Sequence, residues 1–181
     1  MEKHPNVEYI MLSERKIARR IKALGAQLDK LYDGRKPVVV CILKGSSVFF
    51  SDLIRSMKTT LTVDFMEVSS YGSGTKSSGE LTIKKDLSTD ITGRDVLIVE
   101  DIIDSGNTLY NLKKLLIGRT PASVNIVTLL DKPARREAPI EPEYTGFIIE
   151  DEFVIGYGLD YAEEYRNLPY VGVLKRSVYE N

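Results

Sequence analysis

The fold is decided by residues 96–109, which read VLIVEDIIDSGNTL. Four apolar residues of the kind favoured in strands come first, and two carboxylates, Glu100 and Asp101, follow them. A third acid, Asp104, then opens a Ser-Gly-Asn-Thr turn, after which apolar residues recur at helical spacing. The stretch therefore predicts a buried strand, a tight turn and a helix.

The flanking sequence repeats this alternation of strands and helices. Helical periodicity predicts helices over 13–32, 48–57 and 108–117. Runs of β-forming residues predict strands over 38–43, 62–70, 96–99 and 124–130, with shorter pieces at 147–149, 153–155 and 171–174. Such alternation is typical of an α/β fold with an open, mainly parallel twisted sheet and helices on both faces. Ligands then bind at the carboxyl ends of the strands. No interdomain linker is visible, so residues 1–181 are expected to form a single domain.

Composition excludes several classes of protein. Hydrophobic residues make up 43% and charged residues 28% of the chain, and the net charge is −1, which gives no general attraction to nucleic acid or anionic membranes. No apolar run approaches the roughly 20 residues needed to cross a bilayer. The first ten residues, MEKHPNVEYI, lack the apolar core of a signal peptide. The single cysteine, Cys41, is expected in the core of a cytoplasmic protein.

The single histidine restricts the possible chemistry. His4 lies in a polar N-terminal stretch that we expect to be frayed. A Ser-His-Asp triad, a Cys-His pair or a His-rich zinc site would all depend on it. The general base of any reaction is therefore expected to be a carboxylate or a lysine.

The turn at residues 104–108 has the features of a phosphate site, although the usual nucleotide motifs are absent. The sequence GSGTKSSG lacks the third glycine of G-x-G-x-x-G because Ser77 stands in its place. In DSGNT, however, backbone N–H groups can converge on one anion at the start of a helix. Gly106 allows close approach of the backbone, and Ser105 and Thr108 offer hydroxyl groups.

Three acids beside a phosphate site require a ligand that also supplies donors and a metal. The vicinal hydroxyls of a ribose can donate to Glu100 and Asp101, and Mg²⁺ held by a pyrophosphate would offset the remaining charge. A sugar with a 5-phosphate and a 1-pyrophosphate meets both demands. The alternative is structural: Glu100 and Asp101 simply end a strand, and Asp104 caps a helix. The complete string favours the functional interpretation.

This string resembles the phosphoribosyl-pyrophosphate motif of the type I phosphoribosyltransferases, and more narrowly of their bacterial hypoxanthine-guanine branch. The resemblance extends from ILKGS at 42–46 to LPYVGVL at 168–174 through several motifs in order. It implies the type I fold, with a small hood formed by the chain ends. It also implies that Asn107 holds phosphate together with residues 104–108, although some relatives carry lysine at this position.

Further roles follow from the resemblance for the pyrophosphate and the metal. Lys44 and Gly45 match the pyrophosphate loop, in which the peptide before the lysine can be cis, and Arg166 matches another pyrophosphate contact. Mg²⁺ is implied, with Glu100, Asp101 and Asp160 as its expected ligands. Residues Ser70 and Tyr71 begin SYGSGTKSSGE, which matches a mobile catalytic lid.

The purine pocket and the reaction are implied in the same way. Lys132 would donate to the 6-oxo group of the base, which disfavours adenine. Phe153 would stack on the purine, the Val154 backbone would meet its pyrimidine edge, and Asp160 belongs to the same pocket. Asp104 is the expected general base or acceptor at purine N7.

The sequence thus predicts a purine-salvage enzyme that joins hypoxanthine, and guanine, to phosphoribosyl pyrophosphate and releases IMP or GMP and pyrophosphate. A homodimer or homotetramer is implied, with no nucleic-acid or membrane partner. Two alternatives stay open: transfer to another base, such as xanthine or a pyrimidine, and a non-catalytic nucleotide-sensing regulator of the same fold. An intact set of Asp104, Lys132 and Asp160 without a basic stripe disfavours the regulator.

Overall fold

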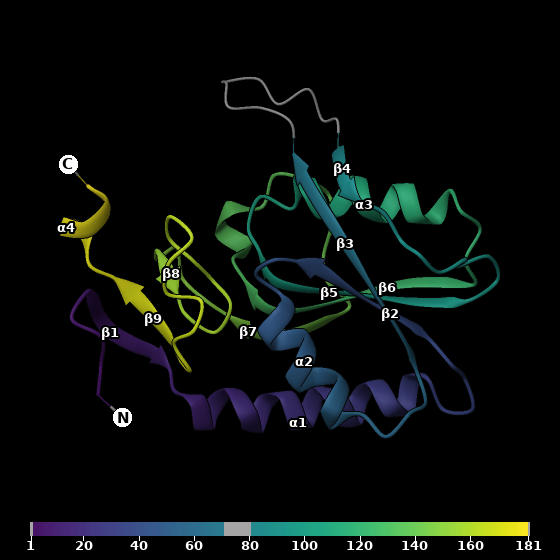
Figure 1. The fold of residues 1–181 in the computed structure, drawn as a ribbon, viewed down its shortest axis with the longest axis horizontal. Helices are drawn as coiled ribbons and strands as arrows, with labels where there is room; N and C mark the ends of the chain where they lie inside the picture. Colours follow the sequence, from purple (N-terminus) through teal and green to yellow (C-terminus); the bar gives the residue numbers. More distant parts are fainter. Residues whose placement is uncertain (1, 71–80, 181) are drawn as a thin grey trace.

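The structure is a computed structural model that describes residues 2–70 and 81–180 (Figure 1). A sheet of six strands forms its centre, in the order β4-β3-β2-β5-β6-β7. These strands are β2 (Val38–Leu43), β3 (Thr62–Ser70), β4 (Leu81–Lys85), β5 (Asp95–Ile103), β6 (Ser123–Asp131) and β7 (Tyr144–Ile148). All neighbouring pairs are parallel except β3 and β4, which makes β4 an antiparallel edge strand. The predicted open, mainly parallel sheet is confirmed.

Helices cover both faces of the sheet because β2 and β5 are apolar on both sides. Along β2, Val39 and Cys41 join the core beneath α1 (Glu14–Leu31) and α2 (Ser47–Ser56). The alternate residues Val38 and Val40 join a second core under α3 (Asn107–Ile117). Cys41 is thus a buried core residue, as expected, and its surroundings raise the pKa of its thiol to about 11, chiefly through burial.

The predicted helix at 13–32 forms because its apolar residues recur on one face. Ile17, Ile21, Leu24 and Leu28 are all buried, and the hydroxyl of Ser13 caps the helix by accepting from the Lys16 N–H at 3.4 Å. Helix α2 begins one residue before the predicted start and ends one residue before the predicted end. The three helical segments are therefore confirmed.

A smaller antiparallel sheet forms beside the main one from the two ends of the chain. Its order is β1-β9-β8, with β1 (Val7–Leu12), β8 (Val154–Ile155) and β9 (Val171–Leu174). Figure 1 shows both termini on this side of the molecule. The expected hood of chain ends is confirmed.

The expectation of a frayed N-terminus was wrong. The backbone N–H of His4 donates to the Tyr170 hydroxyl at 2.8 Å, and its ring packs edge-on against Tyr165 at 5.3 Å. Strand β1 follows directly and pairs with β9, so partners more than 150 residues away hold this segment. The short elements β4, η1 (Pro133–Arg135) and α4 (Arg176–Tyr179) were also not predicted.

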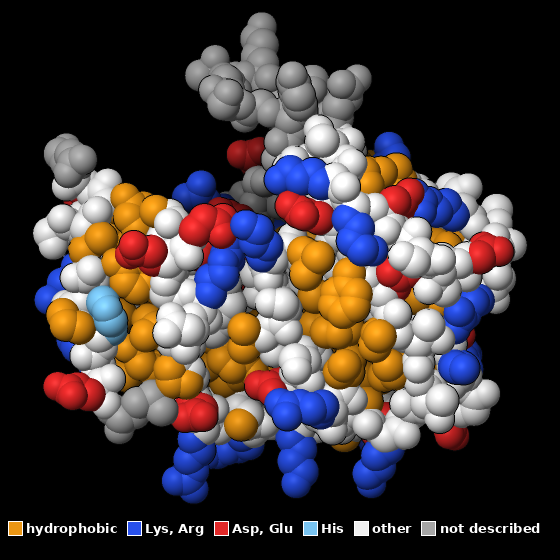
Figure 2. Space-filling view, in the orientation of Figure 1, with side chains coloured by type: hydrophobic (Ala, Val, Ile, Leu, Met, Phe, Trp, Pro, Cys, Tyr) orange, Lys and Arg blue, Asp and Glu red, His pale blue; other side chains and the backbone are white. Residues whose placement is uncertain are grey.

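The surface is mixed in character. Figure 2 shows Lys and Arg side chains projecting along the edge where α1 lies, and apolar side chains between charged groups on the same face. Among the described residues, no helix is both long enough and apolar enough to cross a membrane.

Candidate active site

Three neighbouring strands deliver the predicted residues to one edge of the sheet. Strands β2, β5 and β6 are adjacent and parallel, so their carboxyl ends meet there. The Lys44 loop follows β2, the turn at 104–108 follows β5, and Lys132 follows β6. Strand β5 is longer than predicted and runs to Ile103. Glu100 and Asp101 therefore lie within the strand, whereas the predicted strand ended before them.

The turn at 104–108 joins β5 to α3 as predicted. Gly106 caps the helix with φ 80°, a left-handed conformation that favours glycine. A methyl group at this position would lie 2.8 Å from the side chain of Ile140. The carbonyl of Ser105 accepts from the N–H groups of Glu137 and Ala138 at 2.9 and 3.0 Å. The turn is thus fixed by the segment that follows β6, and it presents the start of α3 to a ligand.

A cleft of ≈ 340 Å³ lies in front of this turn. Its lining includes the following predicted residues: Glu100, Asp104, Ser105, Gly106 and Thr108. Asn107 begins α3 beside them, and its side-chain amide donates to the Glu137 carboxylate at 2.9 Å. Hydroxyl groups, backbone N–H groups and carboxylates therefore face one space, which suits a phosphorylated sugar.

Two adjacent carboxylates lie at the inner end of the site, where Asp101 is buried and Glu100 is half-buried. Burial, together with the neighbouring charge of Asp101, raises the pKa of Glu100 well above its ordinary value. Its buried Oε2 atom has no hydrogen-bond partner among the described residues. Burial raises the pKa of Asp101 to about 6, although its carboxylate accepts from the Ile102 N–H at 2.7 Å. Burial thus disfavours the charge on both carboxylates, and a donor or a cation beside them would stabilise it.

Asp101 also contacts the loop after β2. A Cβ atom on Gly45 would lie 1.7 Å from the Asp101 Oδ2 atom, so glycine is required there. A Cβ atom on Gly158 would lie 2.1 Å from the Gly45 carbonyl oxygen. Gly45 is therefore enclosed between β5 and the segment that follows β8. The Leu43–Lys44 peptide, which the resemblance suggested could be cis, is cis in this structure.

The predicted pyrophosphate residues lie together and are linked by ion pairs. Lys44 Nζ is 3.0 Å from Glu163 Oε2, and Arg166 Nη2 is 3.4 Å from Glu163 Oε1. Arg166 Nη1 is 2.9 Å from Asp160 Oδ1 and donates to the Gly158 carbonyl, also at 2.9 Å. Two cations that are far apart in the sequence thus converge on the Glu163 carboxylate.

A second cleft, of ≈ 420 Å³, contains three of the four predicted purine residues, and the fourth, Asp160, does not line it. Lys132, Phe153 and Val154 line it. The Lys132 side chain is only 8% exposed, and its ammonium donates to the Glu152 carbonyl at 2.7 Å. Phe153 is 39% exposed and stacks on Tyr179 of α4, with ring centroids 4.9 Å apart. One cation and one aromatic platform therefore face the same space.

Asp104 lines both clefts and so lies where they meet. Its Oδ1 atom is 2.7 Å from Arg135 Nε, and Arg135 Nη1 is 3.4 Å from Asp151 Oδ1. Asp151 in turn lies 3.6 Å from Lys132 Nζ. A chain of alternating charges thus joins the expected base to the expected 6-oxo donor.

Arg135, Asp151 and Tyr179 were missed by the sequence interpretation, as was Arg136. Arg136 donates to the Asp104 carbonyl at 3.0 Å and pairs with Asp131, which fixes the turn from behind. The adjacent pair Arg135-Arg136 directly after LLDKPA was a usable signal, since cations beyond a strand end face the same edge as the acids. No local pattern marks Tyr179, because it reaches the cleft from the end of the chain.

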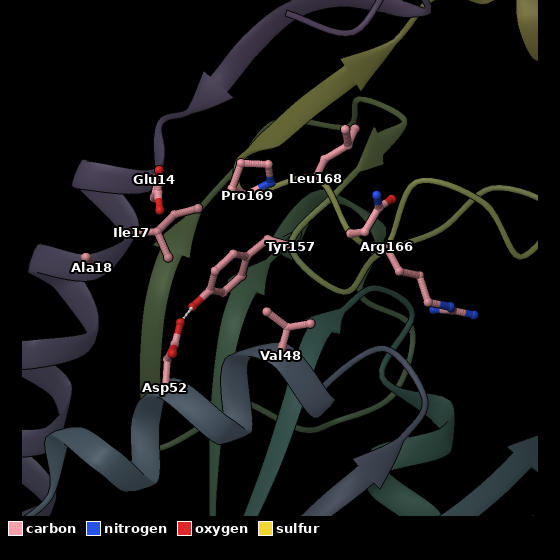
Figure 3. Close-up of a pocket in the computed structure, with 10 residues that line it drawn as sticks. Glu14, Ile17, Ala18, Val48, Asp52, Tyr157, Arg166, Leu168 and Pro169 are labelled. Carbon is pink, nitrogen blue, oxygen red and sulfur yellow. Dashed lines mark hydrogen bonds between the residues drawn. The ribbon is translucent and has the colours of Figure 1, made fainter. Parts of the chain in front are cut away.

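A separate cavity of ≈ 320 Å³ lies between α1, α2 and the segment before β9 (Figure 3). The Tyr157 hydroxyl donates to Asp52 there, which ties this segment to α2. Arg166 borders the cavity, but its guanidinium points away from the Tyr157–Asp52 pair (Figure 3). Among the described residues that line this cavity, Arg166 is the only predicted site residue.

The predicted lid and the predicted metal ligands are the last two features of the site. Ser70 ends β3, and Tyr71 with the rest of the expected lid lies outside the described residues. Within residues 2–70 and 81–180, no group of three or more His, Cys, Asp or Glu side chains is arranged to hold a metal. Asp160 lies beside Arg166, not in a protein-only cage with Glu100 and Asp101.

Comparisons with known proteins agree with this geometry. Residues 10–162 match the model of the phosphoribosyl transferase domain. A hypoxanthine-guanine phosphoribosyltransferase of Bacillus subtilis (strain 168) is 53% identical over 181 residues, which cover 100% of both chains. The bifunctional protein TilS/HprT of Listeria innocua is 53% identical over 97% of this chain, which spans 27% of the length of that relative.

A solved structure gives the same result in three dimensions. The crystal structure of a hypoxanthine phosphoribosyltransferase from Staphylococcus aureus superposes with a TM-score of 0.96 at 54% identity, covering 98% of this chain and 97% of that one. The strand order, the hood and the sequence likeness all point to one family. The chain belongs to the phosphoribosyltransferase family, among its hypoxanthine-guanine members.

Proposed function

We propose that this chain transfers the 5-phosphoribosyl group from phosphoribosyl pyrophosphate to hypoxanthine or guanine, giving IMP or GMP and pyrophosphate. The observation that carries the proposal is the position of Asp104, which lines both the cleft at the phosphate turn and the cleft that contains Lys132 and Phe153. A bond formed between a sugar in one cleft and a base in the other would lie beside this carboxylate.

The sugar phosphate is held by residues 104–108. The start of α3 and the N–H groups of the turn supply donors without any lysine, which is sufficient for a phosphate monoester. Asn107 therefore does not have to supply a charge. Glu100 and Asp101 accept hydrogen bonds from the ribose hydroxyls, and the buried, unpartnered Oε2 atom of Glu100 supports this role.

The donor set also fits Mg²⁺. Hard cations favour carboxylate oxygens, and Mg²⁺ is usually held by one or two carboxylates together with substrate phosphates and water. The lack of a complete protein cage among the described residues fits such a shared site. Glu100, Asp101 and Asp160 would hold the ion, and the raised pKa of Asp101 fits a buried acid whose charge a cation would stabilise. Bound there, Mg²⁺ would neutralise the charge of the leaving pyrophosphate.

The base is recognised in the second cleft. Lys132 donates to the 6-oxo group, Phe153 stacks on the ring, and the Val154 backbone meets the pyrimidine edge. Adenine is disfavoured because its amino group would face the Lys132 ammonium donor. Asp104 accepts the proton or hydrogen bond at purine N7, and its negative charge stabilises positive charge that develops at the ribose.

Release of pyrophosphate across a panel of bases tests the function. With Mg²⁺ and phosphoribosyl pyrophosphate, hypoxanthine and guanine should give turnover and adenine should not. Turnover with a pyrimidine or only with xanthine would show that the chain is a phosphoribosyltransferase for another base. No release with any 6-oxopurine, combined with tight nucleotide binding, would instead favour a regulator.

A homo-oligomer is part of the same proposal. Val63 and Phe65 on β3 are 43% and 36% exposed, and Phe65 packs against Phe50 of α2. Apolar side chains in this position support burial against a second copy. Sedimentation equilibrium of the chain and of Phe65→Glu tests this, because the substitution should lower the mass of the assembly.

A further inference from the structure

Glu163 forms ion pairs with both of the cationic side chains that are expected to bind pyrophosphate. One of its carboxylate oxygens is 3.0 Å from Lys44 Nζ, and the other is 3.4 Å from Arg166 Nη2. Lys44 lies 119 residues away in the sequence, so the contact depends on the fold. A carboxylate bridging two cations in this way resembles one end of a bound oxyanion ligand.

The backbone of this segment holds the carboxylate in place. Ala162, Glu163 and Tyr165 have φ of 52°, 66° and 72°, the left-handed region that L-residues rarely adopt. The Glu163 N–H donates to Asp160 Oδ2 at 3.0 Å, and the Glu164 N–H donates to the Tyr161 carbonyl at 3.0 Å. The left-handed residues and these bonds turn the Glu163 side chain toward Lys44.

The pair contributes little to stability. The side chains of Lys44 and Glu163 are 60% and 65% exposed, and exposed ion pairs are weak because solvent and salt screen them. Carboxylate and ammonium groups exposed to solvent carry full charges at neutral pH. A weak but fully charged contact can exchange with a more highly charged ligand.

We propose that Glu163 is a built-in competitor of pyrophosphate. In the free protein its carboxylate pairs with Lys44 and Arg166, and it leaves when the diphosphate of the sugar substrate or product binds the same donors. This inference rests on the proposed function, since that function places pyrophosphate at these two residues. Its consequence is that Glu163 weakens pyrophosphate binding and favours release of this product.

Titration calorimetry with inorganic pyrophosphate and Mg²⁺ tests the competition directly. Glu163→Gln keeps the shape of the side chain and removes its charge, so pyrophosphate should bind roughly two- to fivefold more tightly, as expected for loss of an exposed ion pair. Glu163→Asp, whose shorter carboxylate cannot span both cations, should give a smaller gain. Glu164→Gln is the matched control: it has the same charge, is exposed and has no ion pair with the described residues, so it should bind like the unaltered protein.

The other outcomes overturn the inference. Equal affinities for the unaltered protein and Glu163→Gln would make Glu163 a passive surface residue. Weaker binding by Glu163→Gln would make it part of the pyrophosphate or metal site. An equal gain in pyrophosphate affinity for Glu164→Gln would show that any loss of negative charge on this segment has the same effect. Failure of the function itself is distinguished by the turnover assay with hypoxanthine, which does not depend on these variants.

Discussion

Replacement of Asp101 by asparagine should stabilise the free protein while weakening its function. Burial raises the pKa of Asp101 to about 6 from an ordinary value of 3.8. Each unit corresponds to about 1.36 kcal/mol, so the charged carboxylate costs the folded state roughly 3 kcal/mol. Asparagine has nearly the same shape, can still accept from the Ile102 N–H, and carries no charge. The protein therefore gives up stability at this position to keep an acid.

The sign of the effect gives it a defined pH dependence. Below about pH 4 the carboxyl is protonated in both the folded and the unfolded state, so Asp101→Asn should change stability little. Between about pH 4 and pH 6 the folded state retains the proton that the unfolded state loses. Above about pH 6 the carboxylate is charged in both states, and the full cost of burying its charge lowers the stability of the folded protein. At pH 8 the free energy of unfolding of Asp101→Asn should therefore exceed that of the unaltered protein by roughly 3 kcal/mol, or about 6–12 °C in Tm.

Denaturant unfolding at pH 4 and pH 8, without ligand or metal, measures this difference. Asp64→Asn is a matched control, because Asp64 is also buried but has a lowered pKa. Burial alone would raise that pKa, but hydrogen bonds from Phe65, Ser88 and Thr89 outweigh it. The control should lose stability at pH 8 and lose less at pH 4. The reasoning is refuted if Asp101→Asn shows no gain at pH 8, or a gain that is the same at both pH values.

The remaining predictions concern chemistry, and each separates one role from a structural effect. Asp104→Asn should lower kcat by roughly 10²-fold or more with little change in phosphoribosyl pyrophosphate affinity, measured by titration; near-normal kcat would leave Asp104 only its structural ion pair with Arg135. Lys132→Ala removes a buried charged hydrogen bond, so it should weaken hypoxanthine recognition by roughly 1.5–3 kcal/mol in kcat/KM and admit adenine; equal losses for the sugar substrate would indicate a role in folding. Chelation of Mg²⁺ should abolish turnover, and Asp160→Ala should raise the Mg²⁺ concentration needed for half-maximal rate; an unchanged requirement would remove Asp160 from the metal site.

The elements that depend on local pattern could be predicted from the sequence. Helix α1 and strand β2 carry their own signals, a helical repeat of buried residues and an unbroken apolar run. Strand β1 carries no such signal, because its register with β9 shifts twice and its buried residues, Val7 and Leu12, do not alternate. Its structure comes from pairing with the other end of the chain.

Some features of the candidate site could also be predicted from local sequence, and others depend on the fold. The turn at 104–108 could be predicted because its residues are contiguous and lie between a strand and a helix. The pairing of Arg135 with Asp104, and of Glu163 with Lys44, could not be predicted, because both depend on how distant loops meet at one edge of the sheet. The position of Asp104 between two clefts is likewise a property of the fold.

The contact of Gly45 with Asp101 and Gly158 restricts how this sequence can change over generations. Three segments that are far apart in the chain meet where the structure leaves no room for a methyl group. A side chain at residue 45 or 158 would have to displace backbone or a buried acid, so neither glycine can drift alone. In a random library selected for activity, these two positions should return as glycine. The neighbouring Lys44 side chain is largely exposed and meets no such spatial limit.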